Sequence, residues 1–154
     1  MRVTEQIQDD VARRVLTDFR PRYAPQGRVV WVSEGNAEPM QSSKTWLQGL
    51  RVSAAAEEEL PNVVVRDSRR RRLWLVDVAT LGRHMNAERR ERLSRILRRS
   101  LATLLFLTAF ENRRQMTRFI LDAPWGTIAW FADEPAHLVH FDDHPDARLL
   151  APPS

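Results

Sequence analysis

The chain contains no cysteine among its 154 residues. Disulfide bonds and thiolate metal sites are therefore excluded, and we expect a protein of the reducing cytoplasm. Long apolar runs are also missing, because no stretch reaches the roughly 18 residues that a membrane-spanning helix needs. The first residues, MRVTEQIQDD, lack the apolar core of a secretory signal peptide. These absences favour a soluble intracellular protein.

Lysine is almost absent as well. Lys44 is the only lysine, although lysine and arginine together number 24. The net charge of +4 therefore rests on arginine, whose planar guanidinium matches the geometry of phosphate, and the bias is typical of a nucleic-acid partner. A genome-wide preference for arginine explains the missing lysines equally well, but it does not explain why the arginines cluster.

The length of the chain suits one domain, which would bury roughly 68–70% of the surface that the unfolded chain exposes. We expect a single domain over residues 1–144. Chain ends are often loosely ordered, so residues 145–154 are expected to form a loose tail.

The centre of the chain, from Leu60 to Leu81, predicts a β-hairpin. It contains two runs of β-branched, aliphatic and aromatic residues, Val63 to Val65 and Leu73 to Val76. Asp67 and Ser68 open the connection between these runs, as polar residues do in turns. Buried strands joined by a polar turn are therefore expected here.

The register of this hairpin brings two polar residues together. If Arg66 pairs with Leu73, the antiparallel ladder places Asn62 opposite Asp77. Both would then lie at the open end of an otherwise apolar ladder. Polar side chains in that position indicate a functional site.

Helical and strand patterns continue on both sides of the hairpin. The expected elements are a helix over Thr4–Phe19 that Pro21 ends, a strand over Arg28–Val32, a short helix over Lys44–Leu50, a helix from the cap Asn86 to about Ser100, a buried and parallel strand over Leu101–Thr108, a short helix over Asn112–Leu121 with Ile120 inward, and strands over Thr127–Phe131 and His137–Phe141. The order is helix, three strands, helix, strand, then one helix and two strands. It predicts an α/β fold with a mixed β-sheet flanked by helices, and its first six elements match the PD-(D/E)XK nuclease core (αβββαβ).

Five segments carry a more specific similarity: FRPRYAPQGRVVWV, LPNVVV, LWLVDVAT, LATLLFLTAFENRRQMTRFI and WGTIAWFADEPAHLVHF. In sequence, order and spacing they resemble the C-terminal catalytic domain of BsuBI/PstI-type type II restriction endonucleases. The resemblance covers most of the chain. It implies a Mg²⁺-dependent double-strand DNA endonuclease of restriction-modification or phage-defence type.

The resemblance also implies where the metal site lies. In the family the first hairpin strand begins with Pro-Asp and the second carries a glutamate, and these carboxylates bind Mg²⁺, which prefers hard oxygen ligands. The matching positions here are Asn62 and Asp77. A third family acid, which follows the first strand, falls on Glu34. The implied metal ligands are thus Asp77, Asn62 and Glu34.

Three positions depart from the active pattern. Asn62 replaces a carboxylate with a neutral amide, which is a weaker ligand for a hard dication. Ala79 stands where the wider superfamily has a lysine, and Glu88 reverses the charge of a family basic residue. Arg89 retains the neighbouring basic position, so the resemblance implies that Arg89 takes over the catalytic role beside Asp77 and Asn62.

The turn of the hairpin is strongly basic. Arg66 and the run Arg69 to Arg72 are candidate DNA-binding residues, because adjacent cations repel one another and a phosphate backbone relieves that repulsion. Alternatively, this turn is an ordinary solvated hairpin tip.

Several alternatives remain open from the sequence. Asn62 either remains from a catalytic site or caps the end of a strand through backbone hydrogen bonds. The chain is either an active nuclease or a catalytically inactive nuclease-fold subunit that binds DNA or a protein partner in a defence complex. A third alternative is an interaction protein without a nucleic-acid role. DNA specificity would come from the chain itself, from a homodimer or from a protein partner.

Overall fold

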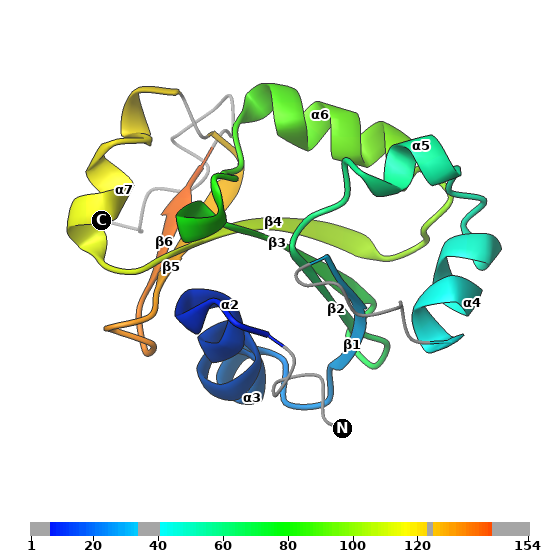
Figure 1. Cartoon of the computed structure of the whole chain (residues 1–154), viewed down its shortest axis with the longest axis horizontal. Coiled ribbons are helices and arrows are strands. Elements are labelled where there is room, and N and C mark those ends of the chain that lie inside the picture. Colours follow the sequence, from blue (N-terminus) through cyan, green and yellow to red (C-terminus); the bar gives the residue numbers. More distant parts are fainter. Residues whose placement is uncertain (1–6, 34–40, 123–124, 143–154) are drawn as a thin grey trace, which may run out of the picture.

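A computed structural model describes residues 7–33, 41–122 and 125–142 of the chain. Its centre is a six-stranded sheet in which the strands follow one another in chain order (Figure 1). The strands are β1 (Arg28–Val32), β2 (Val63–Asp67), β3 (Arg72–Val78), β4 (Thr103–Phe110), β5 (Thr127–Phe131) and β6 (Leu138–Phe141).

The sheet is mixed, which confirms the predicted class. β1, β2 and β3 pair antiparallel, β3, β4 and β5 pair parallel, and β6 pairs antiparallel with β5. The parallel step from β3 to β4 requires a crossover, and a helix supplies it. The strand Thr127–Phe131 has the predicted bounds, whereas the last strand begins one residue later than predicted, at Leu138.

Helices cover both faces of the sheet (Figure 1). They are α2 (Asp10–Arg14), a π-helical turn η1 (Val15–Phe19), α3 (Arg20–Tyr23), α4 (Gln41–Gly49), α5 (Ala54–Glu57), the 3₁₀ turn η2 (Ala79–Leu81), α6 (Ala87–Ile96), α7 (Arg113–Thr117) and the 3₁₀ turn η3 (Ile120–Asp122). Within the described segments, no helix has the length and apolar composition needed to cross a bilayer.

The alternation of side chains along each strand separates the core into two main layers. Val63 and Val65 pack with the amino-terminal helices, while Val64 packs on the other face with residues of α4 and α6. Successive side chains of a strand point to opposite faces, so one run of valines serves both layers. In the first layer, the ring of Phe19 lies 5.1 Å from Trp74 in an edge-to-face arrangement.

The amino-terminal helix does not end at Pro21 as predicted. α2, η1 and α3 follow one another without a break from Asp10 to Tyr23. The backbone N–H of Arg20 bonds to the carbonyl of Val15, five residues earlier. Pro21 lies directly after this π-helical turn, in the first turn of α3, and the fixed φ of proline suits a helix.

Other boundaries also differ from the prediction: α4 begins at Gln41 instead of Lys44, and β4 ends at Phe110 instead of Thr108. α6 ends at Ile96 rather than near Ser100, and β4 begins at Thr103, which leaves Leu101 outside the strand and fully exposed. The helix expected over Asn112–Leu121 is divided into α7 and η3, and the side chain of Ile120 is 45% exposed instead of inward. Short apolar runs do not distinguish a strand from the loop that precedes it, because hydrophobicity alone gives no boundary. The predicted tail, residues 145–154, lies outside the described residues.

Gly27, which precedes β1, provides a test of this packing. An added Cβ atom would lie 2.6 Å from Val65 Cγ1 and 2.9 Å from the carbonyl oxygen of Ala24. We expect Gly27→Ala to lower the free energy of unfolding by about 1–3 kcal/mol, as overpacking does elsewhere. Gly49→Ala in α4 is the matched control, because a Cβ atom there meets nothing within 4 Å and alanine favours helix by roughly 0.5–1 kcal/mol. Urea unfolding of both variants measures the difference, and equal effects would contradict the packing described here.

Candidate active site

Asp77 lies at the carboxyl end of β3, where that strand pairs in parallel with β4. Its side chain is completely buried, and its partner in the register is Thr108. The hydroxyl of Thr108 accepts a hydrogen bond of 2.8 Å from the backbone N–H of Met85, which fixes the segment that leads into α6. The carboxyl ends of parallel strands are the usual location of sites in α/β sheets.

The first turn of α6 brings Arg89 to Asp77. Asn86 caps this helix as predicted, because its side-chain oxygen accepts a 2.8 Å hydrogen bond from the N–H of Arg89. The guanidinium of Arg89 then donates two hydrogen bonds to Asp77. Nη2 lies 2.9 Å from Oδ1, and Nε bonds to Oδ2. This bidentate pair is the strongest form of side-chain ion pair, and it neutralises a carboxylate that is shielded from solvent.

Asn62 lies next to Asp77 in the register, but its side chain bonds to Val78 at the end of β3 and to Ser33 just after β1. The register observed between β2 and β3 contains the predicted pair Arg66 and Leu73 and continues to Val63 and Val76, so Asn62 and Asp77 are the next opposed positions. The amide is 95% buried, since its exposure is 5%. Its Oδ1 accepts a 2.8 Å bond from the N–H of Val78, and its Nδ2 donates a 3.1 Å bond to Ser33 Oγ. These are the contacts of a strand cap.

The described residues do not fit a Mg²⁺ ion. Among residues 7–33, 41–122 and 125–142, no group of three or more histidine, aspartate and glutamate side chains is arranged to hold a metal. Mg²⁺ requires oxygen ligands with compensating negative charge, whereas the charge of Asp77 is compensated by Arg89 and the oxygen of Asn62 is engaged by the backbone. Glu34, the third predicted ligand, lies outside the described residues.

A polar cavity of about 250 Å³ opens beside the ion pair, at the start of α6. Arg89 is one of its lining residues, so the guanidinium lies between the cavity and the buried carboxylate of Asp77. Arg83 and Arg92 line the cavity together with Glu88, which forms a 3.1 Å ion pair with Arg92. The charges of these arginines are largely compensated, because Arg89 pairs with Asp77 and Arg92 pairs with both Glu88 and Glu59. The guanidinium of Arg83 bonds to the backbone carbonyls of Leu60 and Glu58, so the cavity is polar without a strong excess of positive charge.

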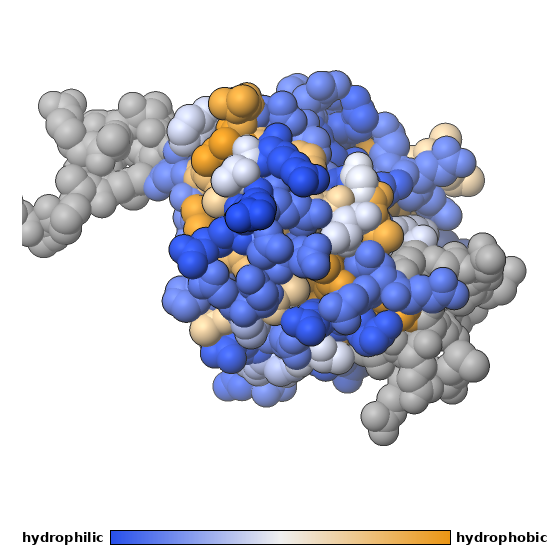
Figure 2. Space-filling view, turned by 60° about the vertical axis from the view of Figure 1, so that its left-hand side comes forward, coloured by the Kyte–Doolittle hydropathy of each residue, from blue (hydrophilic) through white to orange (hydrophobic). Residues whose placement is uncertain are grey.

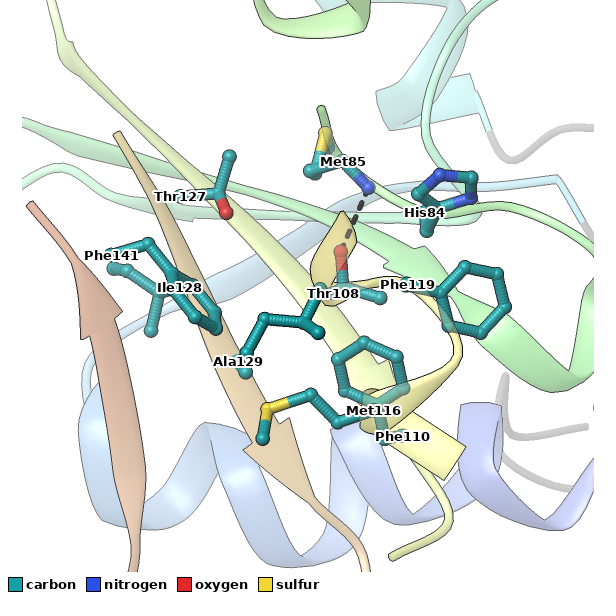
Figure 3. Close-up of a pocket in the computed structure, with 11 residues that line it drawn as sticks. His84, Met85, Thr108, Phe110, Met116, Phe119, Thr127, Ile128, Ala129 and Phe141 are labelled. Carbon is teal, nitrogen blue, oxygen red and sulfur yellow. Dashed lines mark hydrogen bonds between the residues drawn. The ribbon is translucent and has the colours of Figure 1, made fainter. Parts of the chain in front are cut away.

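A second, apolar cavity lies between β4, β5 and the segments that precede α6 and follow β4 (Figure 3). Its volume of about 10 Å³ is no more than a single water occupies. At its edge, His84 Nε2 lies 2.8 Å from Asp122 Oδ2, and the imidazole ring lies 4.5 Å from the ring of Phe119. These contacts hold the segment between β3 and α6 in place. Arg83, His84 and Arg92 were not among the residues predicted from the sequence, because only the fold brings the segment before α6 and the helix itself together at the polar cavity.

The basic turn of the hairpin lies at the other end of β3. Arg72 begins the strand, five residues before Asp77, a separation of roughly 17 Å at 3.3 Å per residue. Arg66 and the four turn arginines are exposed, and none of them forms an ion pair within the described part of the chain. The turn itself forms as predicted, because Asp67 Oδ1 accepts a 3.2 Å bond from the N–H of Arg70. A phosphate at this turn cannot also contact the Asp77 site.

A mixed sheet with a buried acid at the end of its central hairpin, next to the first turn of a crossover helix, defines a nuclease-like α/β fold. The protein-family model of the BsuBI/PstI restriction endonuclease domain matches residues 1–144 of the sequence. The chain belongs to this family. The family resemblance and the restriction-endonuclease-like fold expected from the sequence are thereby confirmed.

Individual relatives agree with this assignment. The type II restriction enzyme BsuBI of Bacillus subtilis is 29% identical over 143 residues, which cover 93% of this chain and 44% of that enzyme. The type II restriction enzyme AplI of Arthrospira platensis is 29% identical over 82 residues, covering 53% of this chain and 25% of that enzyme. The structure of SdaI restriction endonuclease superposes with a TM-score of 0.76 at 26% identity, covering 91% of this chain and 43% of that protein. The chain thus spans less than half the length of these relatives.

Proposed function

We propose that this chain binds double-stranded DNA as a restriction-type nuclease domain and that, in the arrangement described, it does not cleave DNA with Mg²⁺. The single observation that carries the second part is the bidentate bond between Arg89 and Asp77. A guanidinium there leaves the one buried carboxylate of the site without free negative charge. DNA as the ligand is supported by family membership and by the exposed arginines of the hairpin turn.

The competing function is a Mg²⁺-dependent double-strand DNA endonuclease of restriction-modification or phage-defence type. Family membership favours it, and so does the retention of an acid at position 77, where burial of a carboxylate is costly without a purpose. In that function Asp77, Asn62 and Glu34 would hold the metal, and Arg89 would have to release Asp77. For both proposed functions, the expected location of the chain is the cytoplasm.

A further part of the proposal concerns assembly. We propose that a homodimer or a protein partner supplies DNA specificity. Hydrophobic side chains reach the face shown in Figure 2 only in small groups between hydrophilic ones. The most exposed large apolar side chains near the site are Leu121 at 91% and Trp125 at 54%. They are the first residues to substitute if sedimentation shows self-association.

DNA binding through the basic turn has a measurable salt dependence. We expect Arg69→Gln/Arg70→Gln to reduce the slope of log affinity against log salt by about 1.8, because each phosphate contact contributes about 0.9. Fluorescence anisotropy of a labelled duplex at several salt concentrations measures this slope. Arg13→Gln/Arg22→Gln is the matched control, because both arginines are exposed and lie on α2 and α3. An unchanged slope in the turn variant would identify the turn as a solvated tip. Absence of salt-dependent binding by the wild-type chain would contradict the proposed function.

A further inference from the structure

A groove of about 170 Å³ lies where the end of α4, the start of α5 and the end of α6 meet. Four arginines line it, and the remaining lining side chains are neutral. The arginines are Arg51, Arg95, Arg98 and Arg99. The groove lies on the face of the sheet that α4, α5 and α6 cover (Figure 1). It is separate from the cavity beside Asp77, which lies at the first turn of α6.

The arginines of this groove differ in their pairing from the arginines in the first turns of α6. Arg89 pairs with Asp77, and Arg92 pairs with Glu88 and Glu59. The four groove arginines form no ion pair and no side-chain hydrogen bond with any residue that the structure describes. Four guanidinium groups around one groove repel one another, and a bound anion with several oxygens relieves that repulsion.

Arg51 is held in a conformation that arginine rarely adopts. Its φ is 54°, and the surrounding bonds are those of a helix ending in a left-handed residue: Arg51 N to Gln48 O and Val52 N to Leu47 O, both 3.1 Å. Glycine is the usual residue at such a position. Gly49 lies only two residues earlier, in the last turn of α4. Strained backbone at a charged side chain is a recurring property of binding sites.

A second arginine shares this feature. Arg71, in the basic hairpin turn, has φ 54°, and Arg51 and Arg71 are the only non-glycine residues with positive φ in the described part of the chain. The carbonyl of Arg71 accepts a 2.8 Å bond from the N–H of Thr103, four residues after Arg99. In Figure 1, α4, the carboxyl end of α6 and the β2–β3 turn all lie toward the right-hand end of the sheet. The groove and the turn therefore form one basic end of the molecule.

We propose that this groove is a phosphate-binding site for the backbone of double-stranded DNA, forming a second contact surface at the end of the sheet opposite to Asp77. The inference rests on the proposed function in taking DNA as the ligand, but it assigns a different surface. A polymer is favoured over a single anion because unpaired arginines lie both in the groove and at the turn, where the carbonyl of Arg71 bonds to the N–H of Thr103. One small ion contacts only the groove, whereas a phosphate backbone presents a charge at regular intervals and reaches both.

Neutralising the groove tests the proposal. In fluorescence anisotropy with a labelled duplex near physiological salt, we expect Arg95→Ala/Arg98→Ala/Arg99→Ala to weaken affinity on the order of tenfold or more and to reduce the salt slope by about 2–3. Arg13→Ala/Arg22→Ala is the control with exposed arginines on α2 and α3, outside the groove and the turn, and should change affinity less than twofold. Circular dichroism verifies that each variant is folded. Wild-type binding with an unaltered groove variant would overturn this inference alone, whereas a wild-type chain that binds no DNA would overturn the proposed function as well.

Arg51→Gly separates binding from folding at the same site. Glycine relieves the positive φ, so we expect Tm to rise by roughly 2–4 °C, the shift that about 1 kcal/mol gives in a domain of this size. The same substitution removes one guanidinium, so DNA affinity should fall severalfold. A rise in Tm with unchanged DNA affinity would show that Arg51 only ends helix α4 and does not contact DNA. Titration with inorganic phosphate completes the test: saturable phosphate binding to the groove without any effect of the groove variants on DNA would overturn the assignment to DNA.

Discussion

Arg89→Ala is expected to lower the free energy of unfolding by about 3–5 kcal/mol, the usual cost of removing one partner from a buried ion pair. The cost arises at Asp77, which has 0% exposure and receives two hydrogen bonds from Arg89. Without the guanidinium, the carboxylate must either remain charged without a partner or take up a proton. Urea unfolding at neutral pH, followed by tryptophan fluorescence, measures the loss.

Two controls make this result specific. Arg92→Ala lies on the same helix, but its side chain is 43% exposed and its partner Glu88 is 80% exposed, so the expected loss is below about 1 kcal/mol. The double variant Asp77→Asn/Arg89→Met removes both charges and should recover much of the stability lost in Arg89→Ala. Equal, small losses in Arg89→Ala and Arg92→Ala would show that Arg89 does not compensate a buried charge.

Asn62→Asp is expected to create a metal dependence that the wild-type chain lacks. The new carboxylate still accepts the N–H of Val78, and the Ser33 hydroxyl, which now accepts from Asn62, is able to donate instead. It introduces a second negative charge next to Asp77, for which the described residues provide no second cation. The variant should therefore lose about 1–3 kcal/mol of stability in EDTA. It should regain roughly 2.7 kcal/mol when Mg²⁺ or Mn²⁺ is present at about a hundred times its Kd.

The readout for this variant is a thermal shift, with and without the metal, on both proteins. Asn62→Ala serves as the control, because it removes the same cap without adding a charge and should show no response to metal. A large metal-dependent increase in the Tm of the wild-type chain would contradict the account, because it would show that Asp77 already holds a cation with its present neighbours. An unstable Asn62→Asp variant that metal does not rescue would mean that this position is only a strand cap.

The hairpin could be predicted because its information is local. The runs around Val64 and Leu75 and the polar turn at Asp67 fixed the register, and the structure has the predicted pair of Arg66 and Leu73. Asn86 was predictable for the same reason, since a helix cap depends on a few neighbouring residues. The path through Pro21 was not predicted, because the π-helical turn that allows it depends on packing of the whole amino-terminal helix against the sheet.

The site was only partly predictable. The family resemblance indicated Asp77, Asn62 and Arg89, and the fold brings all three to one end of the sheet. The pairing of Asp77 with Arg89 and the engagement of both ends of the Asn62 amide depend on distances between elements, which a sequence does not contain. The groove arginines were missed for a similar reason. In the sequence, Arg51 is separated by more than forty residues from Arg95 and Arg99, and only the folded chain places them beside one another.

Supercoiled plasmid is incubated with the wild-type chain in Mg²⁺ and separately in Mn²⁺. We expect the protein to bind the plasmid, measured as a gel shift, and to yield no nicked or linear product above a protein-free control. Nicked or linear product from the wild-type chain would contradict this expectation, provided that the product disappears with EDTA and with the isosteric substitution Asp77→Asn. That result would show that Arg89 releases Asp77 on DNA and that the chain is an active endonuclease.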